Sequence, residues 1–76
     1  MGTPSPGYFA NQRNVKLYHR IIENLSEETV AADYDFSRVW NIIIGYGVAR
    51  YDHAMQIEAQ DILIRLACRY GVDWRE

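Results

Sequence analysis

The sequence predicts an all-α fold, a small bundle of three or four helices, and two observations support this class. Apolar residues recur at spacings of three and four over residues 11–25 and again over 53–70, the pattern of an amphipathic helix. Residues that begin or end helices stand at the edges of such segments: Ser26, Asp52 and Gly71. The chain has 76 residues and an apolar content of 49%, which suit one domain with a small core.

The N-terminal segment is predicted to be a flexible arm over residues 1–10, followed by a single helical domain over residues 11–76. The arm holds two prolines, two glycines and few residues that can form a core. It has neither the basic start nor the apolar stretch of a signal peptide, and no apolar run comes close to the ~18 residues that a membrane span requires. Cys68 is the single cysteine, which favours a reducing compartment. We therefore expect a cytoplasmic protein without membrane contact.

The first helix is expected to begin at about Asn11 and to carry its apolar residues on one side. These residues are Val15, Tyr18, Ile22 and Leu25, with Leu17 and Ile21 on the neighbouring strip. The polar residues fall mainly on the other side: Lys16, His19, Arg20 and Glu23.

A second, short helix is expected to begin at Ser26, whose hydroxyl can cap it. Two glutamates follow, beside the positive end of the helix dipole. This helix should stop near residues 33–34. Asp35 or Ser37 can then cap a third segment that starts at about Phe36.

The segment 36–51 allows two structures. Its β-branched residues favour a strand, which gives the alternative fold class: α+β with a β-hairpin at about 38–51. Two isolated strands are only marginally stable, however, and helical patterns flank the segment. We therefore expect a helix that is weakened, or bent, at Gly45 and Gly47. Its apolar face would hold Val39, Ile42, Ile43 and Tyr46.

The last helix is expected to run from its cap, Asp52, to Gly71, with Trp74 available to fold back onto the domain. One broad apolar stripe follows this helix: Met55, Ala59, Ile62, Leu63, Leu66 and Tyr70. A narrower apolar line lies roughly opposite the middle of that stripe: Ile57, Ile64 and Cys68. A helix that is apolar on two sides is either central in its domain or shared with another subunit. We expect this line to mediate self-association into a homodimer, although Cys68 taken alone also suits a small core position.

No arrangement of residues in the sequence predicts catalysis, a metal site or a cofactor. His19 and Glu23 stand four apart on one helix, but two ligands do not make a structural metal site. Asp52 and His53 are neighbours, and on a helix their side chains point about 100° apart, so the carboxylate does not orient the imidazole. We therefore expect a protein that is not an enzyme, with no metal and no cofactor.

Charge is distributed unevenly along the chain. The first 22 residues hold Arg13, Lys16 and Arg20 and no acid, whereas residues 23–37 hold five acids and no base. Such an acidic segment is either a solvated region with favourable helix-start charges or a patch that steers the domain to a basic partner. The candidate protein-binding residues combine four of these acids with two interface anchors: Glu27, Glu28, Asp33, Asp35, Arg38 and Trp40.

The predicted function is a small non-enzymatic protein–protein interaction module, an adaptor, accessory subunit or inhibitor that self-associates. Stand-alone inhibitors encoded by phages or mobile elements are often this small and acidic, and the partner would then be a nucleic-acid-handling host protein with a basic surface. The alternative is a dimeric nucleic-acid-binding regulator that uses Arg13, Lys16 and Arg20. The net charge of −2 disfavours nucleic acid, because such binding rests on the neutralisation of phosphates.

Overall fold

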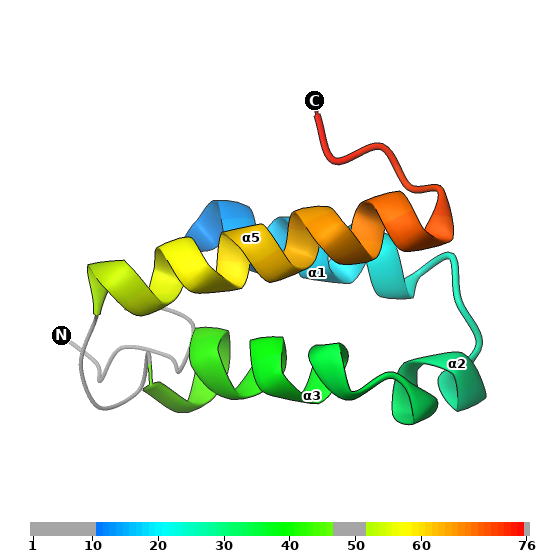
Figure 1. The fold of residues 1–76 in the computed structure, drawn as a ribbon, viewed down its shortest axis with the longest axis horizontal. Helices are drawn as coiled ribbons and strands as arrows, with labels where there is room; N and C mark the ends of the chain where they lie inside the picture. The colour runs from blue at the N-terminus through cyan, green and yellow to red at the C-terminus, as the bar shows by residue number, and fades with distance from the viewer. Residues whose placement is uncertain (1–10, 47–51, 76) are drawn as a thin grey trace, which may run out of the picture.

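A computed structural model describes residues 11–46 and 52–75, and every regular element in these residues is a helix (Figure 1). The predicted fold class, a small all-α bundle, is therefore confirmed. In chain order the elements are α1 (Gln12–Ile22), α2 (Glu27–Ala32), α3 (Tyr34–Trp40), the π-helical turn η2 (Asn41–Tyr46) and α5 (His53–Tyr70).

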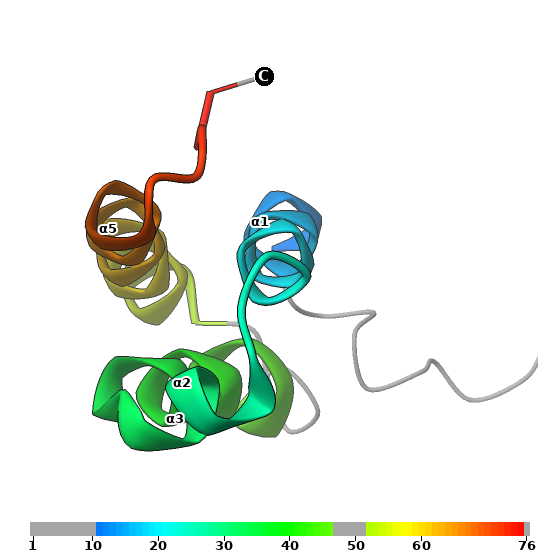
Figure 2. The ribbon, with the colours of Figure 1, turned by 90° about the vertical axis from the view of Figure 1, so that its right-hand side faces the viewer.

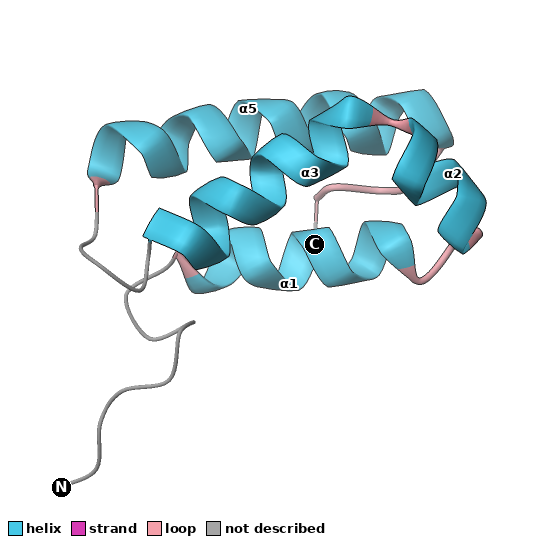
Figure 3. Cartoon of the chain, turned by 90° about the horizontal axis from the view of Figure 1, so that it is seen from below, coloured by secondary structure: helices cyan, strands magenta, loops and turns pink. Residues whose placement is uncertain are grey.

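Three helices make the body of the bundle. The end view places α1, α3 and α5 at the corners of a triangle, with the short α2 at one end of α3 (Figure 2). From below, α3 lies over the space between the other two (Figure 3). Helix α5 packs against α1, α3 and η2, so the longest helix is central. Within the described residues, no helix combines the length and the apolar content that crossing a bilayer requires.

The core lies where the three helices face one another. Helix α1 contributes Ile21, α3 contributes Phe36 and Val39, and α5 contributes Leu63 and Leu66, all almost completely buried. Burying one large aliphatic side chain stabilises a fold by about 1.5–3 kcal/mol, so this cluster is the main source of stability. The other buried apolar residues in the described part of the chain are Leu17, Tyr18, Ile42, Ile43, Ala59, Ile62 and Ala67.

The buried face of α1 is rotated relative to the predicted stripe. Its centre is Leu17 and Ile21, whereas Val15 and Ile22 are only partly buried. The rotation places the polar Asn14 inside the protein. A buried amide needs hydrogen-bond partners, which a count of apolar residues along one helix does not anticipate.

Asn14 finds those partners on α5. Its Nδ2 donates to the backbone carbonyl of Gln56 at 2.8 Å and to Gln56 Oε1 at 3.3 Å. Gln56 is also buried: its Oε1 accepts from the Asn11 amide at 3.3 Å, and its Nε2 donates to the Ile42 carbonyl at 3.4 Å. These two amides therefore join α1, α5 and η2 by polar contacts within the core.

The start of α3 differs from the prediction. The cap is Asp33, which accepts from the Asp35 amide through Oδ1 at 3.1 Å, whereas Asp35 or Ser37 was expected. Asp33 has an extended backbone and is also the C-cap of α2, so one residue ends one helix and begins the next. Ser26 caps α2 as predicted, because its Oγ accepts from the Thr29 amide at 3.1 Å.

The ambiguous segment is helical as far as the structure describes it. Helix α3 continues directly into η2, so the alternative hairpin is wrong over residues 38–46. Gly45 lies within this π-helical turn, a wider turn that agrees with the predicted weakening of the helix. Gly47 and the rest of the segment 47–51 lie outside the described residues, as does the predicted arm over 1–10.

Both ends of α5 are as predicted. The Asp52 carboxylate accepts from the Met55 amide at 3.3 Å and caps the helix. Gly71 ends it with a φ of 70°, a left-handed conformation that glycine adopts without strain. The Val72 amide then donates to the Ala67 carbonyl at 2.9 Å, and the chain turns back toward α1.

Candidate functional site

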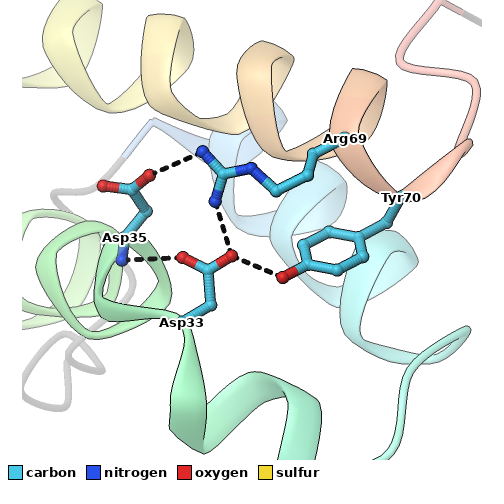
Figure 4. Close-up of polar contacts among 4 residues, drawn as sticks. All are labelled: Asp33, Asp35, Arg69 and Tyr70. Carbon is cyan, nitrogen blue, oxygen red and sulfur yellow. Dashed lines mark hydrogen bonds and ion pairs between the residues drawn. The ribbon is translucent and has the colours of Figure 1, made fainter.

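The four carboxylates predicted to meet a basic partner lie in two different surroundings. Glu27 and Glu28 are in the first turn of α2 and are exposed. Asp33 and Asp35 instead accept from Arg69 of α5 (Figure 4). Arg69 Nη1 lies 2.5 Å from Asp33 Oδ2, and its Nη2 lies 3.2 Å from Asp35 Oδ2. Two of the four carboxylates are thus already paired within the protein.

Asp33 is the centre of this cluster (Figure 4). Its side chain is 8% exposed and also accepts from the Tyr70 hydroxyl. Burial alone would raise the pKa of Asp33, but the hydrogen bonds from Tyr70, Arg69 and the Asp35 amide outweigh burial and hold that pKa below its ordinary value. The hydrogen bond to the Asp33 carboxylate raises the pKa of Tyr70 in turn. The cluster therefore fastens the α2–α3 junction to the end of α5.

The two predicted anchors, Arg38 and Trp40, point to opposite flanks of α3. Arg38 forms an ion pair with Glu58 of α5. Trp40 packs against Tyr18 of α1, with ring centroids 5.5 Å apart, and remains 42% exposed. Residues two apart on a helix point about 200° from each other, so the two side chains do not form one anchor site.

The three predicted self-association residues lie outside the core, and Ile57 and Cys68 are on the outer side of α5. Ile57 is 48% exposed, Cys68 is exposed and Ile64 is half-buried. A core position for Cys68 is therefore wrong. Asp61, which is exposed, falls between them on the same side of the helix, so the apolar line is interrupted by a charge.

A groove between α1 and α5 brings together residues that lie far apart in the sequence. The three bases Arg13, Lys16 and Arg20 line it from α1. Their spacing of three and four places them on one side of that helix. Ile64 lines it from α5, and Trp74 lines it from the C-terminal segment. The cavity volume is about 130 Å³.

The C-terminal segment forms one wall of the groove. After Gly71 the chain runs back along the space between α1 and α5, on the side of the bundle away from α3 (Figures 2 and 3). The Arg20 guanidinium donates to the Asp73 carbonyl and holds the segment in place. The guanidinium of Arg75 lies 5.7 Å from the centre of the Trp74 ring. Trp74 does fold back, and its indole reaches the groove.

The groove is positively charged although the chain as a whole is acidic. No acidic residue is among the described residues that line it. Arg13 and Lys16 form no ion pair within the described part of the chain. Elsewhere, Arg38 and Arg69 are paired with carboxylates. An anion at this groove would therefore meet charges that are not already neutralised.

The described residues that line the groove can bind a ligand through charge, hydrogen bonds and apolar contact. Its walls supply guanidinium, ammonium, indole and aliphatic groups. Among the residues that the structure describes, no three His, Cys, Asp or Glu side chains lie close enough together to hold a metal ion. The Asp52 carboxylate serves as the helix cap.

Comparison of the chain with protein-family models, with curated proteins and with solved structures finds no match. The candidate site thus rests on its own geometry. Sequence reasoning identified the three bases and the free Trp74, but it did not place them in one groove. Spacing along one helix indicates a shared face, whereas the opposite wall comes from residues that are distant in the sequence.

Proposed function

We propose that the chain is a small protein-binding module, an adaptor, accessory subunit or inhibitor that acts in the cytoplasm without catalysing a reaction. The supporting observation is the exposure of aromatic side chains on α3, where Tyr34 is 79% exposed and Trp40 is partly exposed. Tyrosine and tryptophan are enriched among the residues that dominate the energetics of protein interfaces. Tyr34 also borders a hollow between α3 and α5 that is lined in part by Ile42 and Met55. A partner that covers Tyr34 and enters this hollow would bury the ring together with Ile42 and Met55.

The test is affinity for a partner reconstituted from purified components. The tagged chain is used to capture binding proteins from its native host, and the affinity of the purified partner is then measured by calorimetry. Tyr34→Ala should weaken binding at least about tenfold, the loss typical of an interface anchor. Tyr34→Phe keeps the ring and should stay within about threefold of wild type. A Tyr34→Ala variant that binds as tightly as wild type would argue against Tyr34 as the anchor, and the absence of any protein partner would argue against the module.

We also propose that the chain forms a homodimer through the outer side of α5. The exposed Ile57 and Cys68 support this arrangement, because both apolar side chains are left uncovered on one side of α5, with Asp61 between them. Light scattering over a concentration series should give the mass of a dimer for the wild type and of a monomer for Ile57→Glu. Ser37→Glu, which adds the same charge at an exposed position of α3, is the control and should remain dimeric. A wild-type chain that stays monomeric at high concentration rejects the dimer.

Nucleic-acid binding is the second candidate, and one observation favours it. Arg13, Lys16 and Arg20 share one groove beside Trp74, and aromatic rings can stack on bases. The logarithm of the affinity for an oligonucleotide should then fall linearly with the logarithm of the salt concentration. Lys16→Glu should reduce the magnitude of that slope by about one, the contribution of one phosphate contact. Affinity that does not depend on salt would remove this candidate.

A further inference from the structure

We propose that the groove between α1 and α5 binds an acidic segment of the partner protein, one that presents an apolar side chain between carboxylates. This inference rests on the proposed protein-binding function and assigns it a second surface, separate from Tyr34. It also requires a partner segment that is acidic, whereas the sequence predicts a partner with a basic surface.

The rim of the groove supplies the recognition of charge. Arg13 and Lys16 are exposed and unpaired within the described residues, so neither must break an internal ion pair to meet a ligand. A guanidinium binds a carboxylate through two parallel hydrogen bonds, whereas an ammonium acts as a point charge. Arg20 contributes less directly, because it already donates to the Asp73 carbonyl. Two free cations on one helix face therefore favour an anionic ligand.

The size and the lining of the groove supply the second part of the recognition. A cavity of about 130 Å³ is smaller than the roughly 300–1,000 Å³ of sites for small organic molecules. It is lined on its inner side by Leu17, which is almost buried, and by Ile64, which is half-buried. The indole of Trp74 forms a further wall. Aliphatic and aromatic surfaces at this scale suit one apolar side chain, with charged groups to either side.

The same features favour a peptide over a nucleic acid. Tight electrostatic binding to nucleic acid uses on the order of 6–10 phosphate contacts, and this groove offers three basic residues, one of them engaged with the C-terminal segment. A short acidic peptide places its charges only on the rim and its apolar side chain against Leu17 and Ile64.

The experiment measures binding of a capped synthetic peptide that has one central leucine flanked by glutamates. The full chain carries Trp40→Phe, which keeps a ring against Tyr18 and leaves Trp74 as the single tryptophan. At low ionic strength, Trp74 emission should shift to shorter wavelength as peptide is added. A control peptide with glutamine in place of glutamate should bind at least about tenfold more weakly, a difference of ~1.4 kcal/mol.

Three charge reversals locate the site on the protein. Arg13→Glu and Lys16→Glu should each weaken the glutamate peptide about fivefold or more, because an attraction becomes a repulsion at the rim. Arg65→Glu changes the net charge equally but lies outside the groove, and should change affinity less than about twofold. Far-ultraviolet circular dichroism verifies that each variant keeps its helix content.

Several results would overturn the inference. These are equal losses in all three variants, peptide binding by calorimetry without a change in Trp74 emission, no binding at millimolar peptide, or tighter binding of oligothymidylate than of the peptide. The proposed function is separable from this outcome. A reconstituted partner that loses affinity with Tyr34→Ala but not with Lys16→Glu would reject the groove and leave the protein-binding module standing.

Discussion

Replacing Asp33 by alanine tests whether the α2–α3 junction is held by its contacts with α5. The substitution removes the cap of α3, which is worth about 1 kcal/mol. It also removes the acceptor for the Tyr70 hydroxyl and for Arg69. Hydrogen bonds to a charged group contribute about 1.5–3 kcal/mol, and this range is taken at its lower end because Arg69 is partly solvated. The expected loss of unfolding free energy is therefore about 2–3 kcal/mol.

Urea unfolding followed by circular dichroism measures this loss, and two further variants separate its causes. Asp33→Asn keeps a good capping side chain and removes the charge, so it should lose about half as much as Asp33→Ala. Asp35→Ala removes the longer of the two contacts with Arg69 and should lose less than about 1 kcal/mol. Since a domain of 60–100 residues changes its Tm by about 4–8 °C per kcal/mol, Asp33→Ala should melt roughly 10–20 °C below wild type.

A loss below about 0.5 kcal/mol for Asp33→Ala would refute this account of the junction. Equal losses for Asp33→Ala and Asp33→Asn would refute its division into cap and charge, because asparagine caps a helix as well as aspartate does. The result matters for function too. An Asp33 that holds the fold is not a free carboxylate for a basic partner.

Three further predictions follow from the same contacts. Because the pKa of Asp33 is lowered in the folded protein, its contribution to stability is complete above the ordinary carboxyl pKa of about 3.9 and is lost as pH falls through the lower folded value. The urea midpoint of Asp33→Asn should therefore decline less in acid than that of the wild type. Gly71→Ala should lower the free energy of unfolding in urea by about 1 kcal/mol, because a Cβ there meets no neighbour and only the left-handed φ opposes it. An unchanged midpoint would contradict this prediction. Gln56→Leu alone should lose about 1–3 kcal/mol, because Asn14 Nδ2 keeps the Gln56 backbone carbonyl as acceptor but loses Oε1. Asn14→Leu combined with Gln56→Leu should recover part of the loss, and a double variant less stable than the single one would refute the pairing.

The features that the sequence predicted correctly are those set by neighbouring residues. Ser26, Asp52 and Gly71 define helix ends through contacts within three or four positions, so local chemistry was sufficient. The start of α3 was misplaced because two acids stand two positions apart and both can cap. Asp33 is the cap, and its second carboxylate oxygen, Oδ2, accepts from Arg69 and Tyr70 of α5, which are distant in the sequence. The spacing of apolar residues was enough to predict helices, whereas it does not predict a cap that depends on tertiary contacts.

Net charge does not indicate the charge of the groove between α1 and α5, because it averages over side chains with different surroundings. Arg38 and Arg69 are taken up by carboxylates on neighbouring helices, whereas Arg13 and Lys16 have no such partner within the described residues. A ligand responds mainly to charges within a Debye length, about 8 Å at physiological ionic strength, so charges farther away add little. An acidic chain can therefore present a basic groove. The sign of the charge at this groove depends on which charges the fold leaves unpaired, and that follows from helix packing and not from composition.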